Sequence, residues 1–235
     1  MSSLVVEHRF CGPPGYAHGG YLSGVLASHS DRQLRIRLLQ PVPLDATFEV
    51  HTAQDGAVQL RQGERLFARG EPDTLQLSVP HAPSYLQALD ASRGFIGFVR
   101  HAFPQCFACG TERARGDGLR IFAGPLPGSE CVAASWAPDA ALVGVGGKVR
   151  PEFMSAALDC PGYFAARSDG IPMLLGEFAT HVDRCVHIDE PCIVLGWKIS
   201  SSGRKYEVGT ALFDEDGELC ARAHALWIEP RAFPR

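Results

Sequence analysis

Two short stretches of the sequence contain residue types from which a reactive site could be built. The first is His18-Gly19-Gly20, which stands at the start of a helix that we expect over 20–28. A helix N-terminus has unpaired backbone N–H groups and a partial positive charge, so it can stabilise an oxyanion. Glycine there lets a substrate approach the backbone closely because no Cβ intrudes. The alternative is a glycine-rich turn that only precedes the helix.

The second stretch is a helix expected over 151–167, on which polar side chains share one face. Glu152, Ser155 and Asp159 are spaced three and four residues apart, as neighbours on a helix surface are. Because buried carboxylates are costly without partners, this face should line a cleft or else face solvent. In a cleft, Asp159 would act as a general base on water or as a direct nucleophile. Glu152 is the second choice of acid, and Ser155 could orient the water.

The composition of the chain excludes several classes of partner. The 235 residues carry a formal net charge of −4 with no basic block, so we expect no nucleic-acid partner. No apolar run approaches the ~20 residues that cross a bilayer, and the N-terminus lacks the pattern of a secretory signal. We therefore expect a cytoplasmic protein with no membrane partner, whose eight cysteines are free thiols.

Cys106 and Cys109 form a C-x-x-C pair, a spacing that also occurs in metal and redox sites. A structural zinc needs two further ligands, and the sequence shows neither a second C-x-x-C nor a paired Cys/His group. We therefore expect a structural loop, with no metal and no cofactor. Cys160, beside Asp159, is a further candidate nucleophile, but no histidine lies near it in the sequence.

The remaining segments read mostly as strands, with tight turns such as Asp216-Gly217. Proline at 151 suits a first helical turn, whereas Pro161-Gly162 should interrupt the helix. A weaker helix signal covers 84–92. The order of strand, helix and several strands thus occurs twice, which predicts an internal duplication. We expect a first repeat over 1–80, a linker with the C-x-x-C loop over 81–115, and a second repeat over 116–235.

Aligning the two expected helices gives each repeat a different half of a site. The aligned pairs are His18 with Arg150, Gly19 with Pro151, Gly20 with Glu152, Ser23 with Ser155, and Ala27 with Asp159. The first repeat therefore has the glycines without an acid, and the second has the acid without the glycines.

These features resemble the hotdog-fold thioesterase superfamily, in which a long antiparallel sheet wraps one central helix. In members that act on small acyl-CoA or aryl-CoA compounds, that helix often opens with H-G-G and carries an acid nine positions after the histidine. Here Ala27 is nine positions after His18, and Asp159 is nine positions after Arg150. The segment 106–124, CFACG followed by GDGLRIFAG, also looks like a group of bacterial thioesterase-like proteins. The resemblance implies an α+β fold with two hotdog units in tandem.

The resemblance also implies one working site shared between the repeats, because in hotdog dimers the helix N-terminus of one unit faces the acid of the other. Asp159, Gly19, Gly20 and His18 would form the catalytic group. Residues expected to bind substrate are Tyr21, Ser23, Glu152 and Ser155. The implied reaction is hydrolysis of an acyl-CoA or acyl-carrier-protein thioester, with coenzyme A present only as part of the substrate.

Two other functions stay open. A hotdog hydratase or dehydratase would use His18 and Asp159 as a pair, although the sequence lacks the motifs expected of either enzyme. A non-catalytic acyl-CoA-binding protein would fit a chain in which one potential site is degenerate. Long edge strands in such a sheet often pair between chains, so the fold also allows a homo-oligomer.

Overall fold

The computed structural model describes residues 2–166 and 171–231, and within them one antiparallel sheet carries the fold. The strands are β1 (Ser2–Val5), β2 (Leu34–Leu38), β3 (Thr47–Thr52), β4 (Val58–Gln62), β5 (Arg65–Pro72), β6 (Gly124–Pro125), β7 (Val132–Trp136), β8 (Leu174–Val182), β9 (Cys192–Ser202), β10 (Lys205–Asp214) and β11 (Leu219–Ile228). The helices are α1 (Gly19–Ala27), α2 (Tyr85–Arg93), α3 (Pro151–Ala157) and α4 (Cys160–Ala166), with short 3₁₀ turns η1 (His8–Phe10), η2 (Ile96–Phe98), η3 (Ala140–Leu142) and η4 (Val145–Gly147). No helix among the described residues is long and apolar enough to cross a bilayer.

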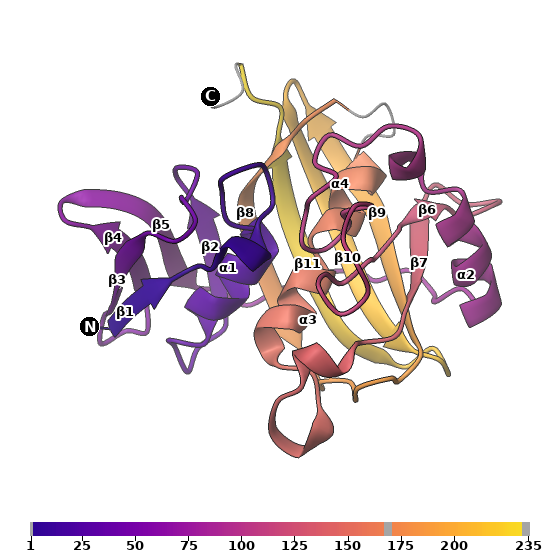
Figure 1. Cartoon of the computed structure of the whole chain (residues 1–235), viewed down its shortest axis with the longest axis horizontal. Helices are drawn as coiled ribbons and strands as arrows, with labels where there is room; N and C mark the ends of the chain where they lie inside the picture. The colour runs from indigo at the N-terminus through magenta and orange to yellow at the C-terminus, as the bar shows by residue number, and fades with distance from the viewer. Residues whose placement is uncertain (1, 167–170, 232–235) are drawn as a thin grey trace.

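The two halves of the sheet have the same strand order. Across the sheet the order is β1-β3-β4-β5-β2-β8-β11-β10-β9-β7-β6. From its outer edge to the middle of the sheet, the first half is β1-β3-β4-β5-β2. The second half, from the opposite edge to the middle and leaving out the edge strand β6, is β7-β9-β10-β11-β8. The helices follow the first strand of each half in the chain: α1 comes after β1, and α3 with α4 comes after β7. Figure 1 shows the halves on either side of α1 and α3.

The halves meet at a short seam between β2 and β8. Its residue pairs are Arg35 with Ala179, Ile36 with Phe178, and Arg37 with Glu177. Ile36 and Phe178 are buried on the helix side of the sheet. At the seam the Arg37 guanidinium lies 2.8 Å from the Glu177 carboxylate.

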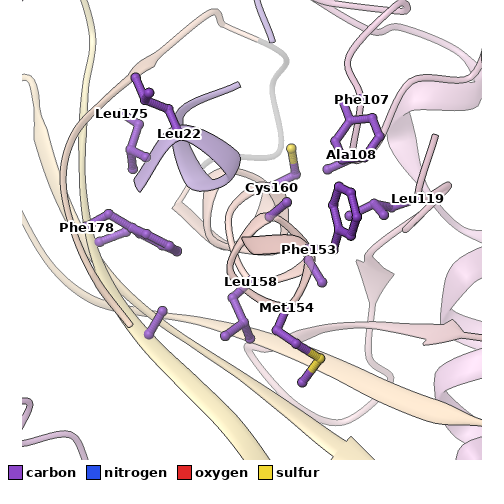
Figure 2. Packing of buried hydrophobic residues seen from close by; sticks show 14 of the residues in the cluster. Leu22, Phe107, Ala108, Leu119, Phe153, Met154, Leu158, Cys160, Leu175 and Phe178 are labelled. Atoms are coloured by element: carbon purple, nitrogen blue, oxygen red, sulfur yellow. The ribbon is translucent and has the colours of Figure 1, made fainter. Parts of the chain in front are cut away.

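Helices cover both faces of the second half. Successive side chains of a strand point to opposite faces of the sheet. On β9, Val194 belongs to the main core, whereas Ile193 packs on the other face in a separate cluster with Ala88 of α2. The helix signal over 84–92 is therefore confirmed as α2, which begins with a capping box made by Ser84 and Gln87. The main core lies between α1, α3 and α4 and the face of the sheet that they cover (Figure 2).

The helix expected over 151–167 is interrupted before Pro161, the residue at which the sequence predicted the break. The last residue of that range, Arg167, lies outside the described residues. α3 ends at Ala157 and α4 begins at Cys160, so the break falls at Leu158 and Asp159. Pro161 lies in the first turn of α4, where a missing N–H breaks no helical hydrogen bond. The Leu158 carbonyl instead accepts a 2.7 Å hydrogen bond from the Thr210 hydroxyl of β10. The break turns Asp159 toward α1.

Helices α1 and α3 pack at backbone distance because α1 has glycine on the contact face. A Cβ built on Gly20 would lie 2.5 Å from the Asp159 Cβ, and one on Gly24 would lie 2.7 Å from the Glu152 Cα and the Ser155 Cβ. Gly20 therefore meets the end of α3 and Gly24 meets its start, so the two helices run antiparallel. The glycines at the start of α1 thus make room for a helix as well as for any ligand.

This packing predicts that Gly24→Ala destabilises the fold. The added methyl group has no space against α3, and overpacking of this kind costs about 1–3 kcal/mol. Urea unfolding followed by circular dichroism should show a lower free energy of unfolding. Gly94→Ala is the matched control, because a Cβ there meets no atom closer than 3.4 Å. Equal stability of the two variants would contradict the prediction.

Candidate functional site

The break between α3 and α4 brings the Asp159 carboxylate to the first turn of α1. Its Oδ2 accepts a 2.7 Å hydrogen bond from the backbone N–H of Gly20, across 139 positions in the sequence. The side chain is 2% exposed. The structure therefore joins the acid of the second half to a helix start in the first half.

His18 lies directly before α1 and contacts the same carboxylate. Its Nδ1 accepts the backbone N–H of Tyr21 at 3.2 Å, as an N-cap side chain does. An uncharged ring that accepts at Nδ1 carries its proton on Nε2. Nε2 lies 3.3 Å from Asp159 Oδ2 and 3.4 Å from the Cys160 sulfur. His18 thus connects the start of α1 to the start of α4.

Both groups of this pair have a raised pKa, for different reasons. Burial raises the pKa of Asp159 from 3.8 to about 6, even though His18 and the Gly20 amide both favour the carboxylate. Burial also pulls the pKa of His18 down, but the nearby Asp159 and Cys106 outweigh it and leave that pKa raised. Asp159 Oδ1 is buried with no hydrogen-bond partner among the described residues. The two carboxylate oxygens thus differ, because a backbone amide holds one of them and not the other.

Gly19 provides a second amide at the start of α1. Gly19 is the first residue of α1, a position whose N–H has no acceptor inside the helix. Gly19 lines a cavity, whereas the N–H of Gly20 donates to Asp159. A carbonyl oxygen in the cavity next to Gly19 would lie near a donor that has no acceptor within α1, at the positive end of the helix.

The cavity has a volume of about 240 Å³ and a mainly apolar wall. His18, Gly19 and Asp159 lie on one part of that wall. The apolar side chains that line it include Leu38, Leu39, Val42, Phe103, Phe164, Met173, Leu174, Leu175, Trp227 and Ile228. An apolar cleft with a few polar groups at one place is the usual form of a small-molecule site.

Three cysteines line the same cavity beside His18. Cys106 and Cys109 come from the loop expected to be merely structural, and Cys160 begins α4. The Cys106 and Cys160 sulfurs are 3.6 Å apart. Figure 2 shows Cys160 between Leu22 of α1 and the loop residues Phe107 and Ala108. Sequence reasoning noted Cys160 and the C-x-x-C pair separately and had no means of bringing them together.

The residues expected to bind substrate do not line this cavity. The Ser155 hydroxyl lies 3.2 Å from that of Thr180, and Glu152 pairs with Arg150. Tyr21 stacks on Phe10 with ring centroids 4.1 Å apart. The Ser23 hydroxyl is buried and has no hydrogen-bond partner among the described residues. Ser155 and Glu152 lie against Gly24, so their shared face packs on α1, and the polar face expected to line a cleft is used for helix packing.

The raised pKa of Asp159 predicts a pH-dependent penalty on stability. The folded carboxyl holds its proton up to about pH 6 and the unfolded one only to about 3.8, so stability falls as pH rises through this window. Asp159→Asn has no proton to lose. Its free energy of unfolding relative to the wild type should therefore rise by up to about 3 kcal/mol between pH 4 and pH 7.

Urea unfolding of both proteins at several pH values measures this difference. The lost interaction with His18 acts in the same direction, because the raised pKa of His18 stabilises the wild type only at lower pH. A difference that stays constant, or one that shrinks as pH rises, would contradict the assignment of a raised pKa to Asp159.

Solved structures share this fold over nearly the whole chain. A Novosphingobium aromaticivorans protein, provisionally named a thioesterase, aligns over 97% of this chain and 94% of its own, with a TM-score of 0.65 and 14% identity. The tesB protein of Mycobacterium avium subspecies paratuberculosis aligns over 97% and 92%, with a TM-score of 0.62 and 16% identity. A Thermobifida fusca protein, provisionally named thioesterase II, aligns over 97% and 93%, with a TM-score of 0.61 and 15% identity.

No protein-family model matches the chain, and no curated protein matches its sequence. At such low identities the structural similarity establishes the fold alone. The expected α+β fold with a large antiparallel sheet is thereby confirmed.

Proposed function

We propose that this chain hydrolyses an acyl thioester, with the carbonyl bound at the Gly19 amide and Asp159 promoting attack by water. The observation that carries the proposal is the hydrogen bond from Gly20 to Asp159 at the wall of an apolar cavity. It fixes an acid beside the Gly19 amide, which is at the N-terminus of α1 and has no acceptor within that helix. Such an amide stabilises the negative charge that develops on the thioester oxygen during attack.

Either role of Asp159 uses the oxygen that has no partner. As a general base, Oδ1 takes a proton from water while the new hydroxide attacks the carbonyl carbon. As a nucleophile, Oδ1 attacks that carbon and forms an anhydride, which water then hydrolyses. In both routes the carbon–sulfur bond breaks, and the thiolate leaves and takes up a proton. Oδ2 stays bound to Gly20 and keeps the carboxylate oriented.

The cavity suits the acyl part of the substrate. Its wall is apolar apart from the reactive corner, with Leu175 and Trp227 among the lining side chains. Burying methylene groups there would contribute about 0.8 kcal/mol each. The thiol part, in a coenzyme A or acyl-carrier-protein thioester, would extend toward the open side of the cavity.

We further propose that the two halves are tandem hotdog repeats with one working site between them. The matching strand orders β1-β3-β4-β5-β2 and β7-β9-β10-β11-β8 support a duplication. The opposite site would need the start of α3, where Pro151 has no N–H and Glu152 pairs with Arg150. It would also need an acid at Ala27 of α1, which has none.

Asp159→Asn should abolish most thioester hydrolysis. Losing the base or nucleophile should lower kcat by about 10²–10⁴-fold, while the amide can still accept from Gly20. Free coenzyme A should be measured by chromatography across acyl-CoA esters of increasing chain length, because thiol reagents would also react with the protein's cysteines. Asp90→Asn is the control, since Asp90 lies on α2 and forms an exposed pair with Arg93.

Activity that survives in Asp159→Asn would exclude this site. Water addition to crotonyl-CoA by the wild type, without thiol release, would favour the hydratase alternative. Saturable binding of acyl-CoA esters without turnover of any of them would favour the non-catalytic alternative.

The pH profile of kcat/KM should have an acidic limb near pH 6. Only the ionised carboxylate can accept a proton or attack, and burial raises its pKa to about 6. Activity should therefore rise about tenfold for each pH unit below that value and level off above it. A profile that stays flat down to pH 4.5 would rule out Asp159 as the group that titrates.

A further inference from the structure

Four potential metal ligands converge from three separate parts of the chain. Cys106 and Cys109 lie in the loop before β6, Cys160 opens α4, and His18 precedes α1. Their exposed fractions are 3%, 4%, 5% and 2%, so all four are buried. The ligand atoms of His18, Cys106 and Cys160 lie within 4.8 Å of one another. Cys109 lies outside that group of three and lines the same cavity as its members.

Two distances within this group are close to the edges of a zinc tetrahedron. Bonds of about 2.3 Å to sulfur and about 2.0–2.1 Å to nitrogen place two sulfurs about 3.8 Å apart and a sulfur and a nitrogen about 3.6 Å apart. The Cys106 and Cys160 sulfurs are 3.6 Å apart, and the Cys160 sulfur is 3.4 Å from His18 Nε2. Small outward shifts of the side chains would therefore admit the ion.

The loop that carries the C-x-x-C pair closes in a tight turn. The Gly110 amide donates a 2.8 Å hydrogen bond to the Cys106 carbonyl. A Cβ on Gly110 would collide with that same carbonyl oxygen, so the turn requires glycine. The loop is also fixed to the first half, because the Phe107 amide donates to the Cys11 carbonyl at 2.7 Å.

We propose that Cys106, Cys109, Cys160 and His18 form a structural zinc site. Three thiolates and one imidazole are a usual donor set for structural Zn²⁺, with a C-x-x-C pair providing two of the ligands. Thiolate ligands favour zinc over magnesium or calcium, which prefer oxygen. With four protein ligands the site is closed, so the ion would hold the structure together and would not bind water for catalysis.

Binding the ion would change the protonation of the group. Each thiol gives up its proton to solvent when it coordinates. His18 must bind through Nε2, so the ring keeps its one proton on Nδ1. That atom now accepts from Tyr21, so metal binding replaces one N-cap hydrogen bond of α1 with a coordinate bond. Asp159 keeps its hydrogen bond to Gly20, but it loses the His18 Nε2 proton, because that nitrogen, 3.3 Å from Oδ2, now binds the ion.

The ion would join the three segments that form the cavity corner. His18 begins α1 beside Gly19, and Cys160 is adjacent to Asp159 in the sequence. A metal bonded to both would fix the distance between the helix N-terminus and the acid. It would also fasten the loop of Cys106 and Cys109 over them.

The test is the metal content and cobalt spectrum of the full-length protein. Protein purified under reducing conditions should contain about one zinc per chain by mass spectrometry of the elements, or should take up one from added Zn²⁺. Replacement by Co²⁺ should give the intense visible bands of tetrahedral cobalt and a near-ultraviolet thiolate-to-cobalt charge-transfer band. Neither readout depends on thioester turnover, so the zinc site and the proposed hydrolysis can fail separately.

Cys106→Ser and Cys160→Ser should lose the bound metal, whereas the control Cys220→Ser should retain it. Cys220 is equally buried, but it lies on β11 and bonds to the Glu218 carbonyl. Wild-type protein that takes up no zinc, or whose cobalt spectrum lacks the charge-transfer band, would overturn the proposal, and so would a Cys106–Cys160 disulfide that persists under reducing conditions. These readouts on the wild type decide the question even if a ligand variant does not fold.

Discussion

The hydrogen bond between the Gly20 amide and the Asp159 carboxylate is the interaction on which the rest of the site depends. A carboxylate that is 2% exposed must find donors, because its hydration is lost on burial. It finds a donor in the Gly20 amide at the N-terminus of α1, and it can reach that amide because α3 ends just before Asp159. The break between α3 and α4 and the capping of α1 by His18 both serve this contact.

The close approach of α1 and α3 follows from the same contact. Asp159 can reach the Gly20 amide only if no side chain separates the two backbones, and a Cβ at Gly20 would lie 2.5 Å from the Asp159 Cβ. Gly24 extends the contact by one turn toward Glu152. The glycines therefore weaken α1 as an isolated helix and permit its packing, which supplies stability that helix propensity does not.

The sequence predicted the partners of the central contact but not the groups around it. Gly20 and Asp159 could be paired because both lie at recognisable positions on two helices of similar pattern. The face of Glu152 and Ser155 was misjudged, since spacing shows which residues share a face and not what that face touches. The cluster of His18, Cys106 and Cys160 was missed because its members are 54 to 142 positions apart. Only the path of the loop over α4 brings them together.

The short seam between β2 and β8 has a consequence for how the protein behaves on dilution. Three residue pairs join the halves across the sheet, and two separate chains held by so short a seam would also have to overcome the loss of translational freedom. Here the two halves are parts of one chain, so their association is intramolecular. Its effective concentration therefore does not depend on the protein concentration. The distance between Gly19 and Asp159 is therefore kept in a single molecule, even at the lowest concentrations.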